Sequence, residues 1–455
     1  MNYFLLKTKI LLIPVYGKVK MNKSPKLSKK AKQLIPGETM LFSKKPDLHL
    51  PDFWPSYFKK AKDCYVWDLN NQKYLDMMFY TGTNVLGYSN KFVNDKVKKN
   101  INSSVMSTLN CPEEVYLAEK IISLHNWADS VRFCRSGGEA NSIAIRIARA
   151  ASMKDKVAIC GYHGWHDWYM SANINDKNNL NKHLLTGLGS KGVPKVLKNT
   201  VFPFEYGNLK QLKKITNIKD LGIIKMELSR STEPDINFLK EVRKLCNKKN
   251  IILIFDECTS GFRQSYGGLH MDYNKDIYPD MSIFGKALGN GYAINAIIGK
   301  QEIMKAANSS FISSTFWTER IGPTAALATL EYMKKYKTWK KIKSSGKLIK
   351  KEWLNISNNN EINISVGGID AIPSFNFIGK DSLYLKTFFT QEMLKRKILA
   401  SNVIFMSIKH DQIQIQKYLD NFNEVFKLIK KYGSKEIKNK HLKGQVCISS
   451  FSRMN

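Results

Sequence analysis

The sequence predicts an α/β fold in which a large domain with a mainly parallel sheet is joined to a smaller α+β domain. The middle of the chain alternates short, continuously apolar runs with helical segments, a pattern typical of strands covered by helices on both faces. The last third carries long lysine-rich helical segments and only weak strand signals. The length of 455 residues, with 43% hydrophobic residues, is enough for a large core and about two or three domains.

The predicted elements begin before the parallel sheet. Residues 63–76 predict a hairpin, because two strand-like runs flank the turn-prone pair Asn70-Asn71. Residues 92–125 are expected to be helical. Continuous apolar runs then predict strands at 131–134, 157–160, 222–228, 251–257, 281–285 and 293–299. Helical patterns predict helices at 138–152, 236–249, 325–357, 385–398 and 411–432.

These elements divide the chain into four parts. We expect residues 1–44 to form an N-terminal tail of unknown role and residues 45–105 to form the N-terminal part of the small domain. We expect the large ligand-binding domain at residues 106–325 and the C-terminal part of the small domain at residues 326–455. The apolar start of the tail is broken by Lys7 and Lys9 and is too short to span a bilayer, and no signal-peptide cleavage pattern follows it. We therefore expect no membrane partner. Met21 begins a polar segment and is an alternative start.

The composition is strongly basic, with a formal net charge of +34. The lysines are spread along the chain, apart from mild clustering at residues 17–32 and 426–443, and arginine is much rarer than lysine. A specific nucleic-acid reader is expected to use arginine and interleaved aromatic side chains. We therefore attribute the charge to compositional bias and expect no nucleic-acid partner, while noting that the charge can steer anionic substrates.

The cysteines and histidines argue against structural cross-links. The seven cysteines are scattered, odd in number and form no CxxC motif, which fits reduced thiols in the cytoplasm. His163 and His166 have a spacing that a metal could use, but no third ligand has a suitable spacing. We therefore expect neither a disulfide framework nor a metal site.

Two strand ends carry residues suited to covalent chemistry. Lys286 directly follows an apolar strand in IFGKALGNGY, and Asp256 ends another in IILIFDECTSGFR. Ligands of open α/β sheets bind at the carboxyl ends of strands. There, a desolvated lysine amine can condense with a carbonyl, and a carboxylate can pair with a buried cation. For each residue taken alone there is an alternative interpretation, namely a surface lysine for Lys286 and a capping carboxylate for Asp256. Because the two residues end successive predicted strands, we expect both side chains to face one crevice.

Loops after other strands supply further candidates. Ser136, Gly137 and Gly138 lie between a strand and a helical segment, where glycine backbone and a helix N-terminus suit a phosphate. The alternative is an ordinary strand–helix turn. Tyr162, in GYHGWHDW, has a ring that can stack on a planar ligand. Thr315, in SSTFWTERIGP, precedes a helix and is alternatively part of an N-cap loop.

In this order the motifs resemble those of the class III aminotransferases, which depend on pyridoxal 5′-phosphate (PLP). The succession is SGGEA, YHG, an isolated strand glutamate, FDE with GFR, FGKALGNG, and STF before a Pro-Ala-rich helix, and it covers roughly residues 45–455. GVPK at 192–195 and NTVFPFEYGNL at 199–209 are most similar to the glutamate-1-semialdehyde 2,1-aminomutase subgroup. The resemblance implies the type I PLP-dependent transferase fold, with PLP as the cofactor.

The resemblance also implies roles around the cofactor ring. Lys286 would hold PLP as a Schiff base, and Asp256 would pair with the pyridine nitrogen. Cys258 would lie under the ring, where the family usually has Val. Tyr162 would stack on the other face, with His163 beside it.

Further roles are implied at the edges of the cofactor. Glu227 would lie near the ring hydroxyl. The phosphate would be cradled by Ser136, Gly137 and Gly138. Thr315 would reach the phosphate from the partner subunit, which implies a homodimer with shared active sites.

Several positions depart from the family pattern. Gly138 stands where Ser or Thr is usual, so one hydroxyl contact to the phosphate is lost. The loop after Thr315 is also altered and places Trp317, Glu319 and Arg320 near the site. Because equivalent positions face substrate in relatives, these changes affect the expected substrate and leave the expected cofactor unchanged.

We therefore expect a PLP-dependent enzyme of amino-group transfer that resembles glutamate-1-semialdehyde 2,1-aminomutase. The alternative enzyme is a transaminase for another substrate, such as a keto-sugar or keto acid in surface-polysaccharide or secondary metabolism. The alternative outside catalysis is a silent binding protein with the PLP-enzyme fold. Retention of both Lys286 and Asp256 argues against that alternative, because a binding module needs neither residue.

Overall fold

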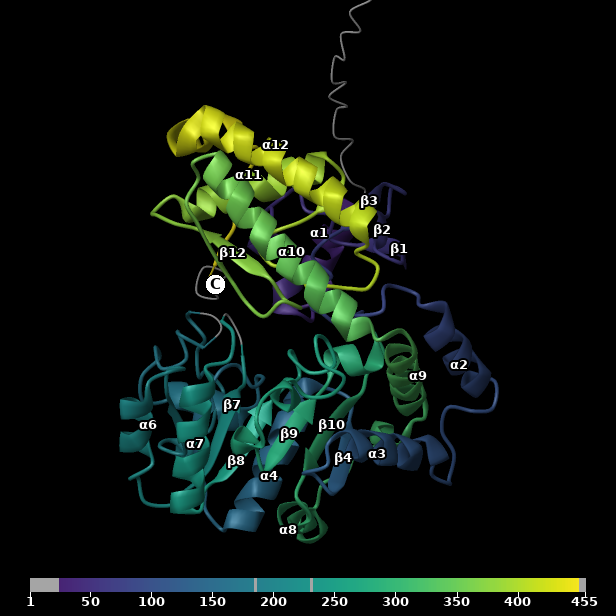
Figure 1. The fold of residues 1–455 in the computed structure, drawn as a ribbon, viewed down its shortest axis with the longest axis vertical. Coiled ribbons are helices and arrows are strands. Elements are labelled where there is room, and N and C mark those ends of the chain that lie inside the picture. Colours follow the sequence, from purple (N-terminus) through teal and green to yellow (C-terminus); the bar gives the residue numbers. More distant parts are fainter. Residues whose placement is uncertain (1–23, 184–185, 230–231, 450–455) are drawn as a thin grey trace, which may run out of the picture.

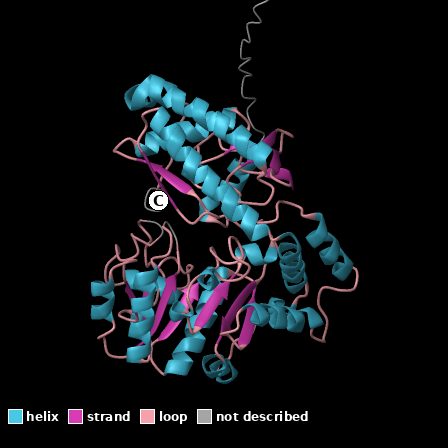
Figure 2. Ribbon diagram, in the orientation of Figure 1, coloured by secondary structure: helices cyan, strands magenta, loops and turns pink. Residues whose placement is uncertain are grey.

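The predicted α/β fold is confirmed by a computed structural model, which describes residues 24–183, 186–229 and 232–449. A seven-stranded sheet with its helices occupies the lower half of Figure 1, and a smaller group of helices and short strands lies above it. Figure 2 shows how helices flank the strands of the large sheet. The expectations for residues 1–23, including a start at Met21, fall outside the described residues.

The large sheet has the strand order β4-β10-β9-β8-β7-β5-β6. Its strands are β4 (Ser130–Cys134), β5 (Lys156–Cys160), β6 (Val201–Pro203), β7 (Leu221–Glu227), β8 (Ile252–Asp256), β9 (Met281–Phe284) and β10 (Asn295–Gly299). β10 runs antiparallel to β4 and β9, and the remaining pairs are parallel. The carboxyl ends of β4, β5, β7, β8 and β9 therefore meet at one edge of the sheet.

Helices cover both faces of this sheet because its strands are apolar on both sides. α4 (Gly137–Ser152) packs on one face, where Ala144 belongs to the same buried cluster as Ile254 of β8. α7 (Ile236–Lys249) covers the opposite face through residues such as Leu239. Each fully buried large apolar side chain contributes about 1.5–3 kcal/mol, so this two-sided burial fixes the sheet that carries the strand ends.

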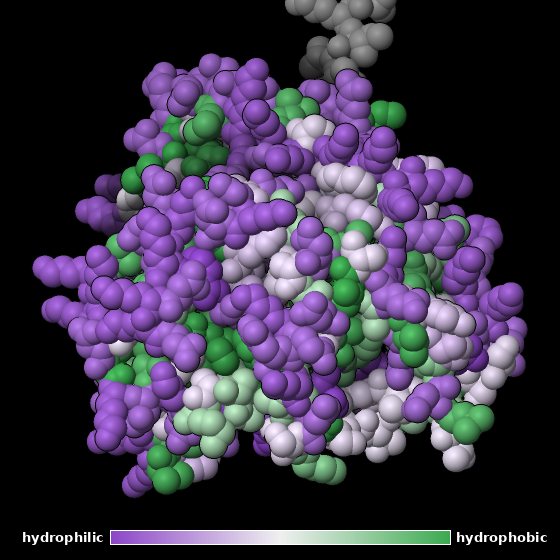
Figure 3. Space-filling view, turned by 60° about the horizontal axis from the view of Figure 1, so that its bottom comes forward, coloured by the Kyte–Doolittle hydropathy of each residue, from purple (hydrophilic) through white to green (hydrophobic). Residues whose placement is uncertain are grey.

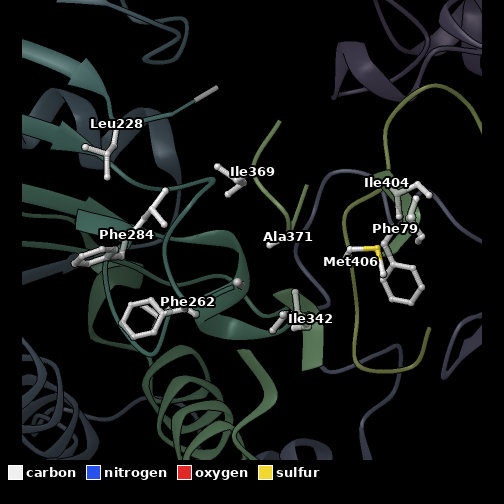
Figure 4. Close-up of a cluster of buried hydrophobic side chains, with 14 of the residues drawn as sticks. Phe79, Leu228, Phe262, Phe284, Ile342, Ile369, Ala371, Ile404 and Met406 are labelled. Atoms are coloured by element: carbon white, nitrogen blue, oxygen red, sulfur yellow. The ribbon is translucent and has the colours of Figure 1, made fainter. Parts of the chain in front are cut away.

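The smaller part consists of a four-stranded sheet of order β1-β2-β3-β13, a hairpin and three long helices. Its strands are β1 (Phe58–Lys62), β2 (Tyr65–Asp68), β3 (Lys73–Asp76), β11 (Ile364–Gly367), β12 (Ser374–Phe377) and β13 (Ile398–Leu399). Its long helices are α10 (Thr338–Asn359), α11 (Ser382–Lys395) and α12 (Gln412–Glu436). One apolar cluster continues from Phe284 through Ile342 to Met406 (Figure 4), so the two parts share a core.

Two predicted helices are each divided in the structure. The predicted helix at 92–125 is wrong as one element, because α2 (Lys91–Ile101) and α3 (Pro112–Leu124) are separated by a loop and α3 begins at a proline, a residue favoured at the first helical position. The prediction at 325–357 is also two helices, because Lys337 adopts a left-handed conformation with φ 47° between α9 (Ile321–Tyr336) and α10. The remaining helices are α1 (Ser24–Leu34), α5 (Asp167–Met170), α6 (Leu209–Ile215) and α8 (Gln301–Met304).

The surface is mostly hydrophilic, with smaller apolar patches between polar side chains in the view of Figure 3. Over residues 24–183, 186–229 and 232–449, no helix combines the length and apolarity needed to cross a membrane. The same residues contain no group of three or more His, Cys, Asp or Glu side chains placed to hold a metal. The domain boundaries remain predictions, and α9 runs across the last of them, between residues 325 and 326.

Candidate active site

The carboxyl ends of three neighbouring strands bring the central candidates together. β7 and β8 pair so that Glu227 lies beside Asp256, and β8 and β9 pair so that Asp256 lies beside Ile283. Lys286 follows the end of β9 by two residues, at the start of a short 3-10 helix. The three functional side chains therefore originate at one edge of the sheet.

Lys286 is held in a strained turn with a lowered amine pKa. Its φ of 44° lies in the left-handed region, which is uncommon for a residue with a side chain and clusters at functional sites. Nζ donates a hydrogen bond to Oγ1 of Thr259 at 2.7 Å. Burial lowers the pKa of Lys286, and the nearby Arg263 guanidinium lowers it further. The larger fraction of neutral amine suits Lys286 to nucleophilic attack and proton transfer.

Asp256 forms a buried pair with His163. The His163 imidazole Nδ1 lies 2.9 Å from Oδ2 of Asp256, and Oδ1 of Asp256 accepts the backbone N–H of Cys258 at 3.1 Å. Burial lowers the pKa of His163, so we assign a neutral ring that donates from Nδ1. Burial alone would raise the pKa of Asp256, but the Lys225 amine and the His163 hydrogen bond hold it below its usual range. The carboxylate is therefore ionised and oriented.

The predicted phosphate loop lies at the N-terminus of the sixteen-residue helix α4. Ser136 is the N-cap, and Glu139 completes a capping box by accepting the backbone N–H of Ser136 at 2.9 Å. The hydroxyl of Ser136 accepts the Glu139 N–H at 3.4 Å. The backbone N–H and the hydroxyl oxygen of Ser136 are thus both engaged with Glu139. The N–H groups of Gly137 and Gly138, at the first turn of α4, are left as the donors for an anion.

His166 occupies the space next to the missing side chain of Gly138. A Cβ added at Gly138 would lie 2.6 Å from Cε1 and 2.9 Å from Nδ1 of His166, which is closer than real contacts allow. Nδ1 of His166 is buried and has no hydrogen-bond partner among the described residues. Glycine at 138 and histidine at 166 are therefore sterically linked. The sequence alone suggested only a metal-ligand role for His166 and gave no indication of this contact.

Glu227, Tyr162 and Cys258 surround the Asp256 pair. Oε2 of Glu227 accepts the backbone N–H of Tyr162 at 3.0 Å, which fixes the loop after β5. A Cβ at Gly161 would lie 2.5 Å from that oxygen, so this loop requires glycine. The Tyr162 ring is partly exposed and contacts Tyr169 edge-on at a centroid distance of 5.9 Å. Cys258 is buried, and burial raises the pKa of its thiol well above the usual value.

Thr315 is placed apart from these residues within one chain. It begins a short 3-10 helix with an exposed side chain, and its carbonyl accepts the Thr318 hydroxyl at 3.0 Å. Across the described ranges, no hydrogen bond or ion pair joins Thr315 to Lys286, Asp256 or Gly138. The contribution of Thr315 to a partner subunit stays a prediction.

The altered loop after Thr315 is tied to its own chain. Glu319 forms an ion pair with Arg135 at 2.7 Å, and its carboxylate accepts the N–H groups of Ile321 and Gly322 at 2.6 and 2.9 Å. Arg320 pairs with Glu113 at 2.5 Å. Glu319 and Arg320 therefore stabilise the loop and the start of α9, which gives them a structural role that the sequence analysis did not foresee.

Comparison with known proteins identifies the family. The profile of the class-III aminotransferases matches residues 52–224 and 231–408, which is most of the chain. The chain belongs to the class-III aminotransferase family. It is 30% identical over 406 residues to 3-aminobutyryl-CoA aminotransferase of Cloacimonas acidaminovorans, covering 87% of this chain and 93% of that protein. It is 29% identical over 445 residues to glutamate-1-semialdehyde 2,1-aminomutase of Wigglesworthia glossinidia brevipalpis, covering 90% and 99%, respectively.

Solved structures support the same fold. The FumI protein of Sphingopyxis sp. MTA144, in its PLP internal aldimine form, matches with a TM-score of 0.81 and 22% identity, covering 90% of this chain and 96% of that one. A PLP-bound transaminase matches with a TM-score of 0.79 and 18% identity, covering 91% and 100%. This class-III aminotransferase therefore has the type I PLP-enzyme fold, uses PLP and is an enzyme of amino-group transfer.

The side chains of this aminotransferase fit PLP. The buried Nε2 of His163 lacks a hydrogen-bond partner among the described residues, next to the ionised Asp256. The first turn of α4 offers glycine N–H groups where a Cβ at Gly137 would meet only Cys258 Sγ, at 3.9 Å. An amine, an ionised carboxylate and an anion site therefore face the same region from β9, β8 and α4.

Three residues near the site were missed from the sequence. Thr259 accepts from Lys286, and Arg263 donates to the Thr259 carbonyl at 2.5 Å and to the Gly82 carbonyl. Burial lowers the pKa of Arg263 to about 9. Lys225 lies inside β7 and was counted as part of an apolar run. The sequence was enough to single out this residue, because alternation along a strand places Lys225 on the same face as Glu227.

Proposed function

We propose that Lys286 is the residue that carries PLP covalently and transfers the proton during amino-group transfer. This proposal rests on the position of the Lys286 amine, whose pKa is lowered. Lys286 follows β9, and β9 pairs with β8, which ends at Asp256 of the Asp256–His163 pair. PLP supplies an aldehyde for covalent attachment and a ring that accepts electron density. The other steps depend on side chains of this chain.

Each side chain has a separate task in this proposal. Thr259 positions the Lys286 amine through the 2.7 Å hydrogen bond, so that Nζ can accept a proton from one carbon and return it to another. Asp256, oriented by His163, holds a positive charge at the ring nitrogen. Gly137 and Gly138 bind the phosphate through backbone N–H groups. Glu227 keeps the Tyr162 backbone in place, and the Tyr162 ring then stacks on the cofactor.

We propose an intramolecular transfer on an amino-aldehyde such as (S)-4-amino-5-oxopentanoate as the first candidate reaction. It is supported by the aminomutase of Wigglesworthia, which aligns over nearly its whole length. The second candidate is transfer between two substrates, which is supported by the 30% identity to an aminotransferase for a CoA ester. In both reactions Lys286 moves the proton, and the candidates differ in whether the carbonyl product leaves.

Product analysis separates the two reactions. The purified enzyme with PLP is incubated with (S)-4-amino-5-oxopentanoate alone, and then with a panel of amines together with keto acids, keto-sugars and CoA esters. Formation of 5-aminolevulinate from the first substrate alone supports the aminomutase. Product that requires a separate amino acceptor supports the transaminase and excludes the first candidate.

Borohydride reduction tests the role of Lys286. We expect the protein with PLP to be yellow and to lose its visible band on reduction, with the adduct mapped to Lys286 by peptide mass spectrometry. Lys286→Ala should form no reducible adduct, because the amine that condenses with the aldehyde is absent. Lys300→Ala, at a partly exposed lysine paired with Asp280, is the matched control and should behave as the unchanged protein. A reducible adduct in Lys286→Ala would refute the assignment.

We also propose a cytoplasmic homodimer whose subunits share active sites. Thr315 is exposed and is flanked by Phe311 and Phe316, whose side chains are 88% and 68% exposed. Large apolar side chains in such positions favour burial against another protein surface. All seven cysteines are free thiols, which is typical of a reducing compartment.

A further inference from the structure

Lys225 is a charged residue in the middle of a central strand. It lies on β7 between Ile159 of β5 and Ile254 of β8, in register with both, and its side chain is fully buried. Its Nζ has no hydrogen-bond partner among the described residues. A buried amine without such a partner is costly, so an unpaired lysine at this position needs a compensating interaction.

The charged groups around Lys225 belong to the proposed cofactor site. Alternation along β7 places Lys225 on the face of Glu227, and pairing with β8 places Asp256 on that face as well. Burial lowers the pKa of Lys225. Its electrostatic interactions with Asp256 on β8, with Cys258 in the loop after β8 and with Glu227 on its own strand oppose this shift and favour the protonated amine. It also acts on His163, from the loop after β5. Burial raises the pKa of the Cys258 thiol, so the carboxylate of Asp256 is the anion on β8 that compensates Lys225.

We propose that Lys225 is a positioning residue. Its amine is a second cation beside the Asp256 carboxylate, and it weakens the binding of a protonated cofactor ring. This inference rests on the proposed pairing of Asp256 with the ring nitrogen. A positive charge at that nitrogen would lie near the same carboxylate as Lys225, and two cations around one buried anion repel each other. Lys225 therefore maintains the Asp256 carboxylate before PLP arrives and opposes the ring charge afterwards.

This arrangement predicts an unusual direction for a substitution next to a cofactor. Removal of a buried residue that only supports the site should weaken PLP binding. Removal of the Lys225 charge should instead strengthen the part of binding that depends on the ring nitrogen. Lys225→Met keeps the length of the side chain and removes the charge, so it tests this sign directly.

The experiment compares PLP with 1-deazapyridoxal 5′-phosphate, in which a C–H group replaces the ring nitrogen. Equilibrium titration of the apoenzyme gives a dissociation constant for each compound, and their ratio reports the contribution of the ring nitrogen. We expect Lys225→Met to raise the preference for PLP about tenfold, which corresponds to about 1.4 kcal/mol. Lys225→Gln, also neutral but polar, is the second variant and should change the ratio in the same direction.

Ile223→Met is the matched control for the packing of the strand. Ile223 is fully buried on the same face of β7, two residues before Lys225, and carries no charge. We expect its ratio to stay within about twofold of the unchanged protein. An unchanged or lower preference for PLP in the neutral variants would overturn the proposal, whichever of the two variants folds.

Asp256→Asn distinguishes failure of this inference from failure of the proposed function. If Asp256 holds the ring nitrogen, Asp256→Asn should reduce the preference for PLP, and a Lys225→Met substitution added to it should have a smaller effect than it has alone. If Asp256→Asn leaves the ratio unchanged, the proposed role of Asp256 is wrong and the role of Lys225 falls with it. If Asp256→Asn reduces the ratio and the neutral Lys225 variants do not raise it, only the role of Lys225 is wrong.

Discussion

At the scale of single residues, Asp256 is prepared for a cationic partner before any ligand is bound. His163 and the backbone N–H of Cys258 each donate to one of its carboxylate oxygens. The Lys225 amine and, after it, these donors hold the pKa of Asp256 below the usual range despite burial. A preorganised charge of this kind lowers the free energy of a transition state in which positive charge must be retained on the cofactor ring.

Asp256→Asn should therefore bind PLP but react slowly. The amide keeps the shape of the side chain and cannot hold the proton of the ring nitrogen, so stabilisation of the transition state falls by about 3–4 kcal/mol, or roughly 100- to 1000-fold in rate. The measurement is a single-turnover rate with amine substrate under saturating PLP. Asp235→Asn, at the exposed N-cap of α7, is a control distant from the site. A rate for Asp256→Asn within about threefold of the unchanged enzyme would contradict the role.

The close contact between Gly138 and His166 leads to a second prediction at the scale of residues. Gly138→Ser introduces the residue type that the family resemblance implies at this position, yet its Cβ would lie 2.6 Å from Cε1 of His166. Such overpacking costs typically about 1–3 kcal/mol, so the thermal stability of the apoenzyme should fall. Gly137→Ala is the matched control, because its Cβ would meet only Cys258 Sγ at 3.9 Å. Adding His166→Ala to Gly138→Ser should restore stability, and failure to do so would show that the two residues are not linked by this contact.

At the scale of elements, strand ends were easier to predict than helix ends. Six strands of the large sheet were predicted because each is a continuous apolar run, whereas β6 has only three residues and gives no periodic signal. The positions of Asp256 and Lys286 followed directly from such runs. The break at Lys337 was not predictable from local sequence, because lysine rarely adopts a left-handed conformation and packing imposes it here. Lys225 was missed because it was counted within the apolar run that predicted β7, although alternation places it on the same face as Glu227.

Helix α9 illustrates an end that tertiary structure determines. Its N-cap, Arg320, makes no side-chain cap, and Glu319 instead accepts the N–H groups of Ile321 and Gly322 while pairing with Arg135. Because Arg135 directly precedes the predicted phosphate loop, Glu319 couples the start of α9 to that loop. A helix was correctly predicted in this region. Its N-terminal cap was not predicted, because the capping residue Glu319 is held by Arg135, which lies in the turn after β4.

Glu319→Ala should destabilise the protein by about 3 kcal/mol, because it leaves Arg135 without its partner and removes the cap of α9. The two side chains are only 15% and 13% exposed, so solvent compensates little. Glu424→Ala is the control, because its pair with Lys427 is 57% and 58% exposed and should contribute less than about 1 kcal/mol. The measurement is chemical denaturation at fixed protein and PLP concentration, and equal effects of both substitutions would refute this account.

At the scale of the whole molecule, one chain brings together the residues proposed to bind the cofactor ring and leaves Thr315 at the surface. Asp256, His163 and Lys286 come from adjacent strands or their loops, while Thr315 lies beside the exposed Phe316. An enzyme that holds its phosphate from two subunits needs such a loop to be exposed in the isolated chain. The role of this loop at a partner subunit was predicted from family resemblance, and it stays a prediction.

The shared-site proposal predicts that PLP binding depends on assembly. If Thr315 donates to the phosphate bound in the other subunit, PLP and dimerisation stabilise each other by mass action. Thr315→Val removes one hydrogen bond to a charged group, worth about 1.5–3 kcal/mol, so PLP affinity should fall about tenfold to a hundredfold. The loss should be larger than in relatives with Ser or Thr at position 138, because Gly138 supplies no hydroxyl.

Titration of PLP at several protein concentrations, with sedimentation run alongside, measures both equilibria. Thr318→Val is the matched control, because its hydroxyl is already donated to the carbonyl of Thr315 within the same chain. It should alter local stability and leave the dependence of PLP affinity on protein concentration unchanged. A monomer that binds PLP as tightly as the dimer would exclude the shared site, whatever the effect of Thr315→Val, because the phosphate would then be held completely by the first turn of α4 in one chain.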